Sequence, residues 1–272
     1  MRQRVIIACL ISLCVAGIVF LFFLAKKSDN PAENTQENEP SGILGETQEK
    51  IAEKVEAVED FFRKDEEDTS PDSESEKYFL HENITVTLFW VGEKAGDDNN
   101  DISNSPSAWD EKWKKHFGGT DSPKRRNGFY PADFVPKENP FYAALPYNDF
   151  GKNGKRKQEV AKIIPWAKEK KYSEDESMCK NRWLKIAKGT KAAYAQWEDV
   201  GPFNEDDEDY VFGSASPKSK TNKNAGLDVS PAIRDYLDLK DIDKVDWQFV
   251  DEKDVPDGPW KKIITVSQID WN

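Results

Sequence analysis

The stretch that decides the fold is "YAQWEDVGPF", residues 194–203. Polar and apolar residues alternate from Tyr194 to Glu198, which is typical of a β-strand with one buried face. The strand ends in a carboxylate, Asp199, and the pair Gly201-Pro202 then predicts a tight turn. An acid at the end of a strand, on the edge of a turn, is a candidate for chemistry at the rim of a β structure.

The residues around this stretch predict a mainly β domain. The sequence "NRWLKIAKGTKAAYAQWED", residues 181–199, indicates a hairpin that turns at Lys188–Thr190. Further strands are expected in residues 83–93, 141–145, 244–252 and 260–268. Short helices are expected in residues 108–117 and after Ser230, which is a good helix cap followed by a proline. Many short strands without regular alternation of strand and helix favour a small β-barrel.

The N-terminus predicts a membrane anchor. An unbroken apolar run extends from Val5 to Ala25, with arginines before it and Lys26-Lys27 after it. About 20 apolar residues span a bilayer as a helix, whereas the apolar core of a cleaved signal peptide is about 7–15 residues long. We therefore expect an uncleaved single-pass anchor in residues 1–27, in the cell membrane. The C-terminal domain is expected to be extracytoplasmic, in the periplasm or on the cell surface.

Residues 28–76 are expected to form a flexible acidic linker. The whole chain has a net charge of −12, and residues 29–76 alone contain 17 acids and four bases, so the domain at 77–272 is close to neutral. Such a composition keeps a chain disordered. Ile51, Val55, Val58 and Phe62 have helical spacing and indicate a short amphipathic helix. It either packs on the domain or frays, or it forms a coiled-coil dimer.

Other classes of site have little support in the sequence. Two of the three cysteines lie in the anchor, which leaves Cys179 alone and predicts neither a disulfide nor a cysteine metal site. His81 and His116 are far apart without evident companions, so we expect no metal and no cofactor. Residues 204–210, "NEDDEDY", lack the glycine spacing of a calcium loop. The sequence has no phosphate-binding loop and no basic patch for nucleic acid.

Three motifs follow one another in the second half of the chain. The hairpin leads into "WEDVGPF", residues 197–203, and then "GLDVSPAIRDYL", residues 226–237, precedes the strand "VDWQFV". This order of motifs resembles the double-psi β-barrel domain of the rare lipoprotein A family. These match the family's Asn-Asp-Arg-Gly-Pro-Phe and Ile-Asp-Leu-Ser segments, and "FYAALP" resembles its Thr-Ala-Ala-His segment. The resemblance implies a six-stranded double-psi β-barrel with short helices, a barrel that expansins, family 45 glycoside hydrolases and membrane-bound lytic transglycosylase A share.

The chain departs from that pattern near the expected site. The family's histidine after the alanine pair is absent, since Leu145 follows Ala144, and Glu198 and Val200 replace the asparagine and arginine beside the key aspartate. Lytic activity is therefore not inherited from the resemblance alone.

The residues themselves suggest glycan chemistry. Cleavage of a glycosidic bond needs an acid to protonate the leaving oxygen, and a second carboxylate can activate water. Asp199 is the first candidate for the catalytic acid, and Asp149 in "ALPYNDF" is the candidate for the second carboxylate. The alternative is a structural role for each, in which Asp199 caps the turn and Asp149 caps a loop. Residues proposed to contact the substrate are Trp90, Tyr147, Trp197, Phe203, Glu198 and Asp228.

Two functions follow from these expectations. The first is a membrane-anchored envelope protein whose barrel binds and cleaves a polysaccharide such as peptidoglycan, by lytic transglycosylation or hydrolysis. The second is a non-catalytic wall-binding or interaction module on the same barrel. A groove that holds Asp199 with a second polar partner would favour the first.

Overall fold

The computed structural model describes residues 77–96 and 102–271. The expected anchor, the acidic linker and its amphipathic helix lie outside the described residues. In the part of the chain that is described, no helix is long and apolar enough to cross a membrane.

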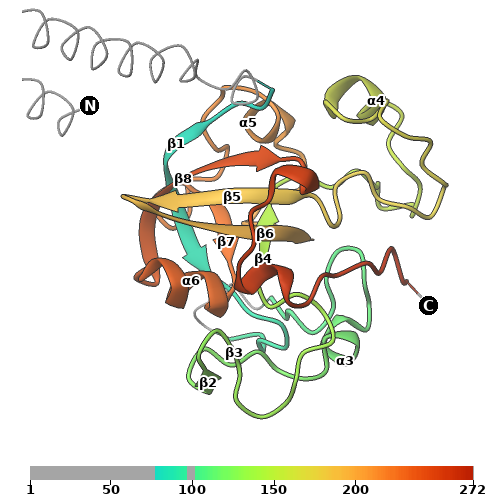
Figure 1. The fold of residues 1–272 in the computed structure, drawn as a ribbon. Helices are drawn as coiled ribbons and strands as arrows, with labels where there is room; N and C mark the ends of the chain where they lie inside the picture. The colour runs from blue at the N-terminus through green and yellow to red at the C-terminus, as the bar shows by residue number, and fades with distance from the viewer. Residues whose placement is uncertain (1–76, 97–101, 272) are drawn as a thin grey trace, which may run out of the picture. The chain divides into compact units, whose positions relative to one another are not determined.

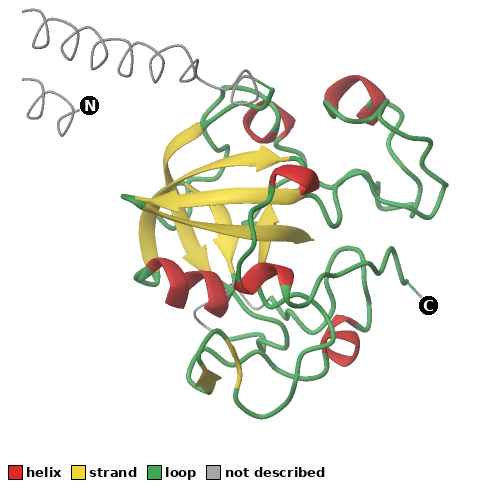
Figure 2. Ribbon diagram, in the orientation of Figure 1, coloured by secondary structure: helices red, strands yellow, loops and turns green. Residues whose placement is uncertain are grey.

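Six strands form a closed barrel (Figures 1 and 2), in the order β1-β7-β4-β6-β5-β8. The pairs β1–β7 and β4–β6 are parallel, and the other four pairs are antiparallel. The expectation of a mainly β barrel is confirmed. The strand bounds are β1 His81–Leu88, β4 Tyr142–Leu145, β5 Trp183–Lys188, β6 Lys191–Val200, β7 Ala225–Val229 and β8 Ile242–Val250.

Short elements surround the barrel. The helices are α3 Trp113–Phe117, α4 Val160–Ile163, α5 Glu208–Val211 and α6 Pro231–Leu237, with 3-10 turns η1 Glu252–Asp254 and η2 Pro259–Lys261. A small separate ribbon joins β2 Arg126–Asn127 to β3 Tyr130–Pro131. The expected cap of α6 is confirmed, because the Ser230 hydroxyl accepts a hydrogen bond from the Ile233 amide.

The expectation of a strand at residues 260–268 is wrong. Pro259 opens η2, and the chain then runs without a strand ladder through residues 264–268. The reason lies in Gln196 of β6, whose side-chain amide accepts from the Thr265 backbone amide at 2.8 Å and donates to the Thr265 carbonyl at 2.9 Å. A side chain therefore satisfies the backbone groups that a neighbouring strand would otherwise have paired.

The apolar residues form two clusters on opposite sides of β4. Ala143 and Leu145 belong to the main cluster, with Trp197, Trp247 and Phe249 inside the barrel. Because side chains alternate along a strand, Tyr142 and Ala144 face outward. They pack in the second cluster with Phe89, Val91, Trp113 and Phe117, so residues 89–96 and 102–117 cover the outer face of β4.

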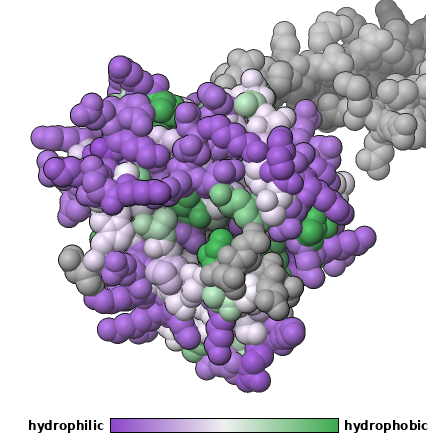
Figure 3. All heavy atoms as spheres, turned by 180° about the vertical axis from the view of Figure 1, so that it is seen from behind, coloured by the Kyte–Doolittle hydropathy of each residue, from purple (hydrophilic) through white to green (hydrophobic). Residues whose placement is uncertain are grey.

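One face of the molecule can be described from its hydropathy. The face opposite to that of Figure 1 is mainly hydrophilic, with hydrophobic residues gathered near its centre (Figure 3). Eight large apolar side chains of the described residues are exposed, among them Val135, Val266, Ile102 and Phe203.

A substitution at Gly226 in β7 can test the packing of the barrel. A methyl group on Gly226 would lie 2.5 Å from Pro217 Cγ and 2.6 Å from the Tyr210 hydroxyl. Overpacking of this kind costs about 1–3 kcal/mol, so Gly226→Ala should lower the free energy of unfolding by at least ~1 kcal/mol. Gly96→Ala is the matched control, because its methyl would meet no atom closer than 4.0 Å. Urea denaturation measures both, and equal stability of the two variants would contradict this packing.

Candidate functional site: a carboxylate pair on the outer face of the barrel

Two carboxylates lie on either side of one residue of β4. Ala144 pairs with Asp199 of the parallel strand β6 and with Asp228 of the antiparallel strand β7. Side chains at paired positions of a sheet point to the same face. Because Ala144 faces outward, the structure brings Asp199 and Asp228 together on the outer face of the barrel. The turn after β6 borders them, since a methyl group on Gly201 would lie 3.4 Å from Asp228 Oδ2.

Asp199 is the more enclosed member of the pair. Its side chain lies under the segment that covers β4, and the residue is only 8% exposed. Its Oδ1 accepts hydrogen bonds from the backbone amides of Ala108 and Val200, both at 2.8 Å. Burial raises the pKa of Asp199 to about 7, although these two hydrogen bonds act to lower it.

Asp228 is the more accessible member and is partly exposed. Its Oδ1 accepts a hydrogen bond from the Thr87 hydroxyl of β1. Burial raises the pKa of Asp228 to about 7, and the negative charges of Asp199 and Glu93 raise it further. Two interacting carboxyls with elevated pKa values can hold a proton at neutral pH, which is a property of acid-base sites.

Glu93 is a third acid of the site that the sequence analysis did not select. It follows β1 within "LFWVGE", and its carboxylate accepts a hydrogen bond from Asn104 Nδ2 at 2.8 Å. Its charge acts on Asp228. The signal that could have found it is its place just beyond a strand that pairs with β7, the strand of Asp228.

Asp149, the predicted second catalytic carboxylate, has other contacts. It is fully buried, and its carboxylate accepts hydrogen bonds from the Ser177 hydroxyl at 2.8 Å and the Met178 amide at 2.7 Å. Burial raises its pKa. These contacts fix residues 177–178 to the loop after β4. The strand register instead places Asp228 on the same face of the barrel as Asp199.

Glu198, the residue before Asp199, forms a buried ion pair with Lys180. Burial raises the pKa of Glu198 to about 7, against the opposing effect of the lysine charge. Glu198 Oε1 has no hydrogen-bond partner within the described residues. Lys180 also donates a hydrogen bond to the Ser267 hydroxyl, so the Glu198 carboxylate lies beside Lys180 and Ser267.

Two of the four aromatic residues proposed to bind a sugar are core residues. Trp197 and Tyr147 are at most 1% exposed, and Trp197 Nε1 donates to the Asp199 carbonyl at 2.8 Å. Stacking on a sugar does not fit such enclosed rings. Phe203 is 37% exposed, just after the Gly201-Pro202 turn, and Trp90 is partly exposed after β1. These two rings are accessible to a ligand.

His116 has companions, contrary to the expectation from sequence. Ligand atoms of Asp110, His116 and Asp270 all lie within 4.8 Å of one another. Ala108, whose amide binds Asp199, is two residues before Asp110. A second group of chemically active side chains therefore lies along the same covering segment.

The carboxylate pair makes stability depend on pH. The folded-state pKa values near 7 exceed the ordinary 3.8 of aspartate, so the folded protein binds more protons than the unfolded chain between about pH 4 and 7. The contribution of the pair to stability is present below pH 4 and is lost as the pH rises through 7. Asp228→Asn should therefore raise the stability at pH 8 by about 1 kcal/mol or more, and much less at pH 4.

Urea denaturation of both proteins at pH 4 and pH 8 measures this difference. Comparison with wild type cancels the titration of other groups, including His81, whose pKa burial lowers to about 4. An equal effect of Asp228→Asn at both pH values would show that the two carboxyls do not have elevated pKa values.

Comparison with known proteins gives no family for this chain. No protein-family model matches it, and no curated protein matches it. The resemblance to double-psi barrels therefore rests on the motifs of residues 181–250, and the closed six-stranded mixed barrel is compatible with it.

Proposed function

We propose that residues 77–272 form a double-psi barrel of the rare lipoprotein A type that binds and cleaves a polysaccharide such as peptidoglycan. One observation carries this proposal. Asp199 and Asp228 flank Ala144 on one face of the barrel, and burial raises the pKa of each to about 7. Asp228 is a second polar partner for Asp199, which favours cleavage over binding alone.

The pair can perform acid-base catalysis on a glycosidic bond. Asp199 and Asp228 interact through their charges, because ionisation of one opposes ionisation of the other. The protonated carboxyl donates to the leaving oxygen, and the same group can then act as a base toward water or a sugar hydroxyl. Asp228 is the more exposed, so we assign it the proton transfer to the substrate. Asp199 is held by two backbone amides, and its charge adds to burial in raising the pKa of Asp228.

Accessible aromatic rings near the pair support a sugar ligand. Phe203 follows the Gly201 turn that borders Asp228, and Trp90 follows β1, whose Thr87 binds Asp228. The flat faces of such rings pack against the apolar faces of sugars. Stacking on Phe203 and Trp90 would place a glycan across the carboxylates.

The N-terminal sequence supports an envelope location. We propose that residues 1–27 anchor the chain in the cell membrane and that residues 28–76 extend the barrel toward the wall. A long acidic tether of this composition repels itself and gives the barrel reach.

A binding module without catalysis is the second candidate. Asp199 Oδ1 accepts two backbone hydrogen bonds that hold residue 108 against β6, which is a structural use of the carboxylate. In that case the exposed rings and Asp228 would bind the glycan, and no bond would be cleaved.

Two substitutions separate the roles of the pair. Asp228→Asn keeps the shape of the side chain but cannot transfer a proton, so cleavage should fall about 10²–10⁴-fold at every pH. Asp199→Asn removes a negative charge beside Asp228 and lowers its pKa, so the remaining activity should shift to lower pH. Mass spectrometry of soluble fragments released from purified peptidoglycan at pH 5, 6, 7 and 8 measures both effects.

Asp133→Asn is the matched control, because Asp133 is an exposed aspartate paired with Arg125. It should leave release of fragments unchanged. Full activity of Asp228→Asn would remove the carboxylate pair from the mechanism. Binding of peptidoglycan by the wild type without release of any fragment would establish the binding module instead.

A further inference from the structure

We propose that His116 and Asp270 bind one divalent transition-metal ion, of the class that includes zinc, and that Asp110 holds the other ring nitrogen of His116. The site is independent of the carboxylate pair and of the function proposed for it. It ties the C-terminal segment to the segment that covers β4.

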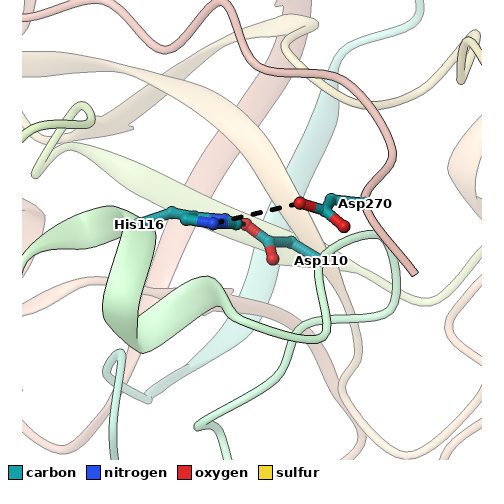
Figure 4. A group of neighbouring side chains, drawn as sticks. All are labelled: Asp110, His116 and Asp270. Carbon is teal, nitrogen blue, oxygen red and sulfur yellow. Dashed lines mark hydrogen bonds and ion pairs between the residues drawn. The ribbon is translucent and has the colours of Figure 1, made fainter. Parts of the chain in front are cut away.

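The three side chains converge from distant parts of the sequence (Figure 4). His116 Nδ1 lies 2.7 Å from Asp110 Oδ2, and His116 Nε2 lies 3.9 Å from Asp270 Oδ2. Zinc binds nitrogen and carboxylate oxygen at about 2.0–2.2 Å, so two ligands of one ion lie at most about 4.3 Å apart. The separation of His116 Nε2 from Asp270 thus allows both to bind one ion with little movement. One ligand atom from each of the three residues lies within 4.8 Å of the others.

The backbone holds the two carboxylates in place without an ion. Asp110 and Asp270 form a parallel β-bridge. The Glu111 amide donates to the Asp270 carbonyl at 2.8 Å, and the Asp270 amide donates to the Trp109 carbonyl at 2.9 Å. His116 belongs to the short helix α3, which is anchored by the buried rings of Trp113 and Phe117. A preformed arrangement of this kind lowers the cost of ordering ligands when an ion binds.

The charge of the group favours a cation. Asp110 is 1% exposed, and His116 is the side chain that forms an ion pair with it within the described residues. Two carboxylates around one imidazole leave excess negative charge, and a buried carboxylate is costly unless it is neutralised. A divalent ion would neutralise both acids. Nitrogen together with carboxylate ligands suits zinc, cobalt or manganese better than calcium, which prefers oxygen alone.

A neighbouring pocket supplies an independent observation. His116 lines a pocket of about 300 Å³ together with Glu138, Ser267 and Thr265. Glu138 is only 7% exposed, and its Oε2 is buried without a hydrogen-bond partner in the described part of the chain. The volume beside His116 leaves room for water molecules bound to an ion. Two protein ligands beside this pocket leave the remaining positions around the ion to water.

Metal titration of the full chain tests the proposal. After dialysis against a chelator, isothermal titration calorimetry with ZnCl₂ should show binding of about one equivalent per chain. His116→Ala and Asp270→Asn should each weaken it by at least ~100-fold, the upper end of the effect of losing an outer-shell partner. Cobalt substitution supplies a second readout, because its visible spectrum reports nitrogen and oxygen ligands.

The variants separate loss of a ligand from loss of the fold. The Asp270 side chain is 39% exposed, so Asp270→Asn should fold and retain the thermal midpoint of the metal-free wild type. Asp133→Asn should bind zinc as the wild type does. Zinc should raise the thermal midpoint of the wild type and of Asp133→Asn but not of Asp270→Asn. Absence of zinc binding by the wild type, or equal affinity of Asp270→Asn, would show that the three residues are only a hydrogen-bonded link.

Discussion

The pairing of β4 with two different neighbours is the constraint on which the rest of the structure depends. This strand has four residues, all buried, and it lies between a parallel partner and an antiparallel partner. Its inward residues join the barrel core, and its outward residues require cover from residues 89–96 and 102–117. The same two partners place Asp199 and Asp228 beside Ala144. The closed barrel, the covering segment and the carboxylate pair are therefore consequences of one set of backbone hydrogen bonds.

The local sequence pattern was sufficient to predict much of the barrel. The alternation of residues 181–199 predicted the hairpin of β5 and β6, and Ser230-Pro231 predicted the start of α6. These features depend on side chains a few residues apart. Residues 260–268 were also expected to form a strand but do not, because Gln196 of a distant strand takes the hydrogen bonds of Thr265. The periodicity of apolar residues indicates which face of a segment is buried. It does not indicate which group pairs with the backbone amides and carbonyls of that segment.

The local sequence pattern could not predict which residues come together in the candidate sites. Asp199 was identified because a strand and a turn surround it, yet its partner depends on the register of β4 with both β6 and β7. Asp149 was proposed from the sequence as the second carboxylate beside Asp199, but its carboxylate accepts hydrogen bonds from Ser177 and Met178. Asp270 reaches His116 only after the whole barrel has brought the C-terminal segment back to residue 110. Such contacts between distant residues are set by topology rather than by motif.

The attachment of Thr265 through side chains gives the C-terminal segment a separate stability. Gln196 and Asn139 hold Thr265, since the Asn139 amide donates to its hydroxyl at 3.0 Å. No strand pair of the barrel includes a residue beyond β8. Residues 261–271 can therefore open as a unit while the barrel stays closed, with an opening free energy below that of global unfolding. In hydrogen-exchange terms the Thr265 amide belongs to a subglobal unit, and its protection reports the attachment of the tail rather than the integrity of the barrel.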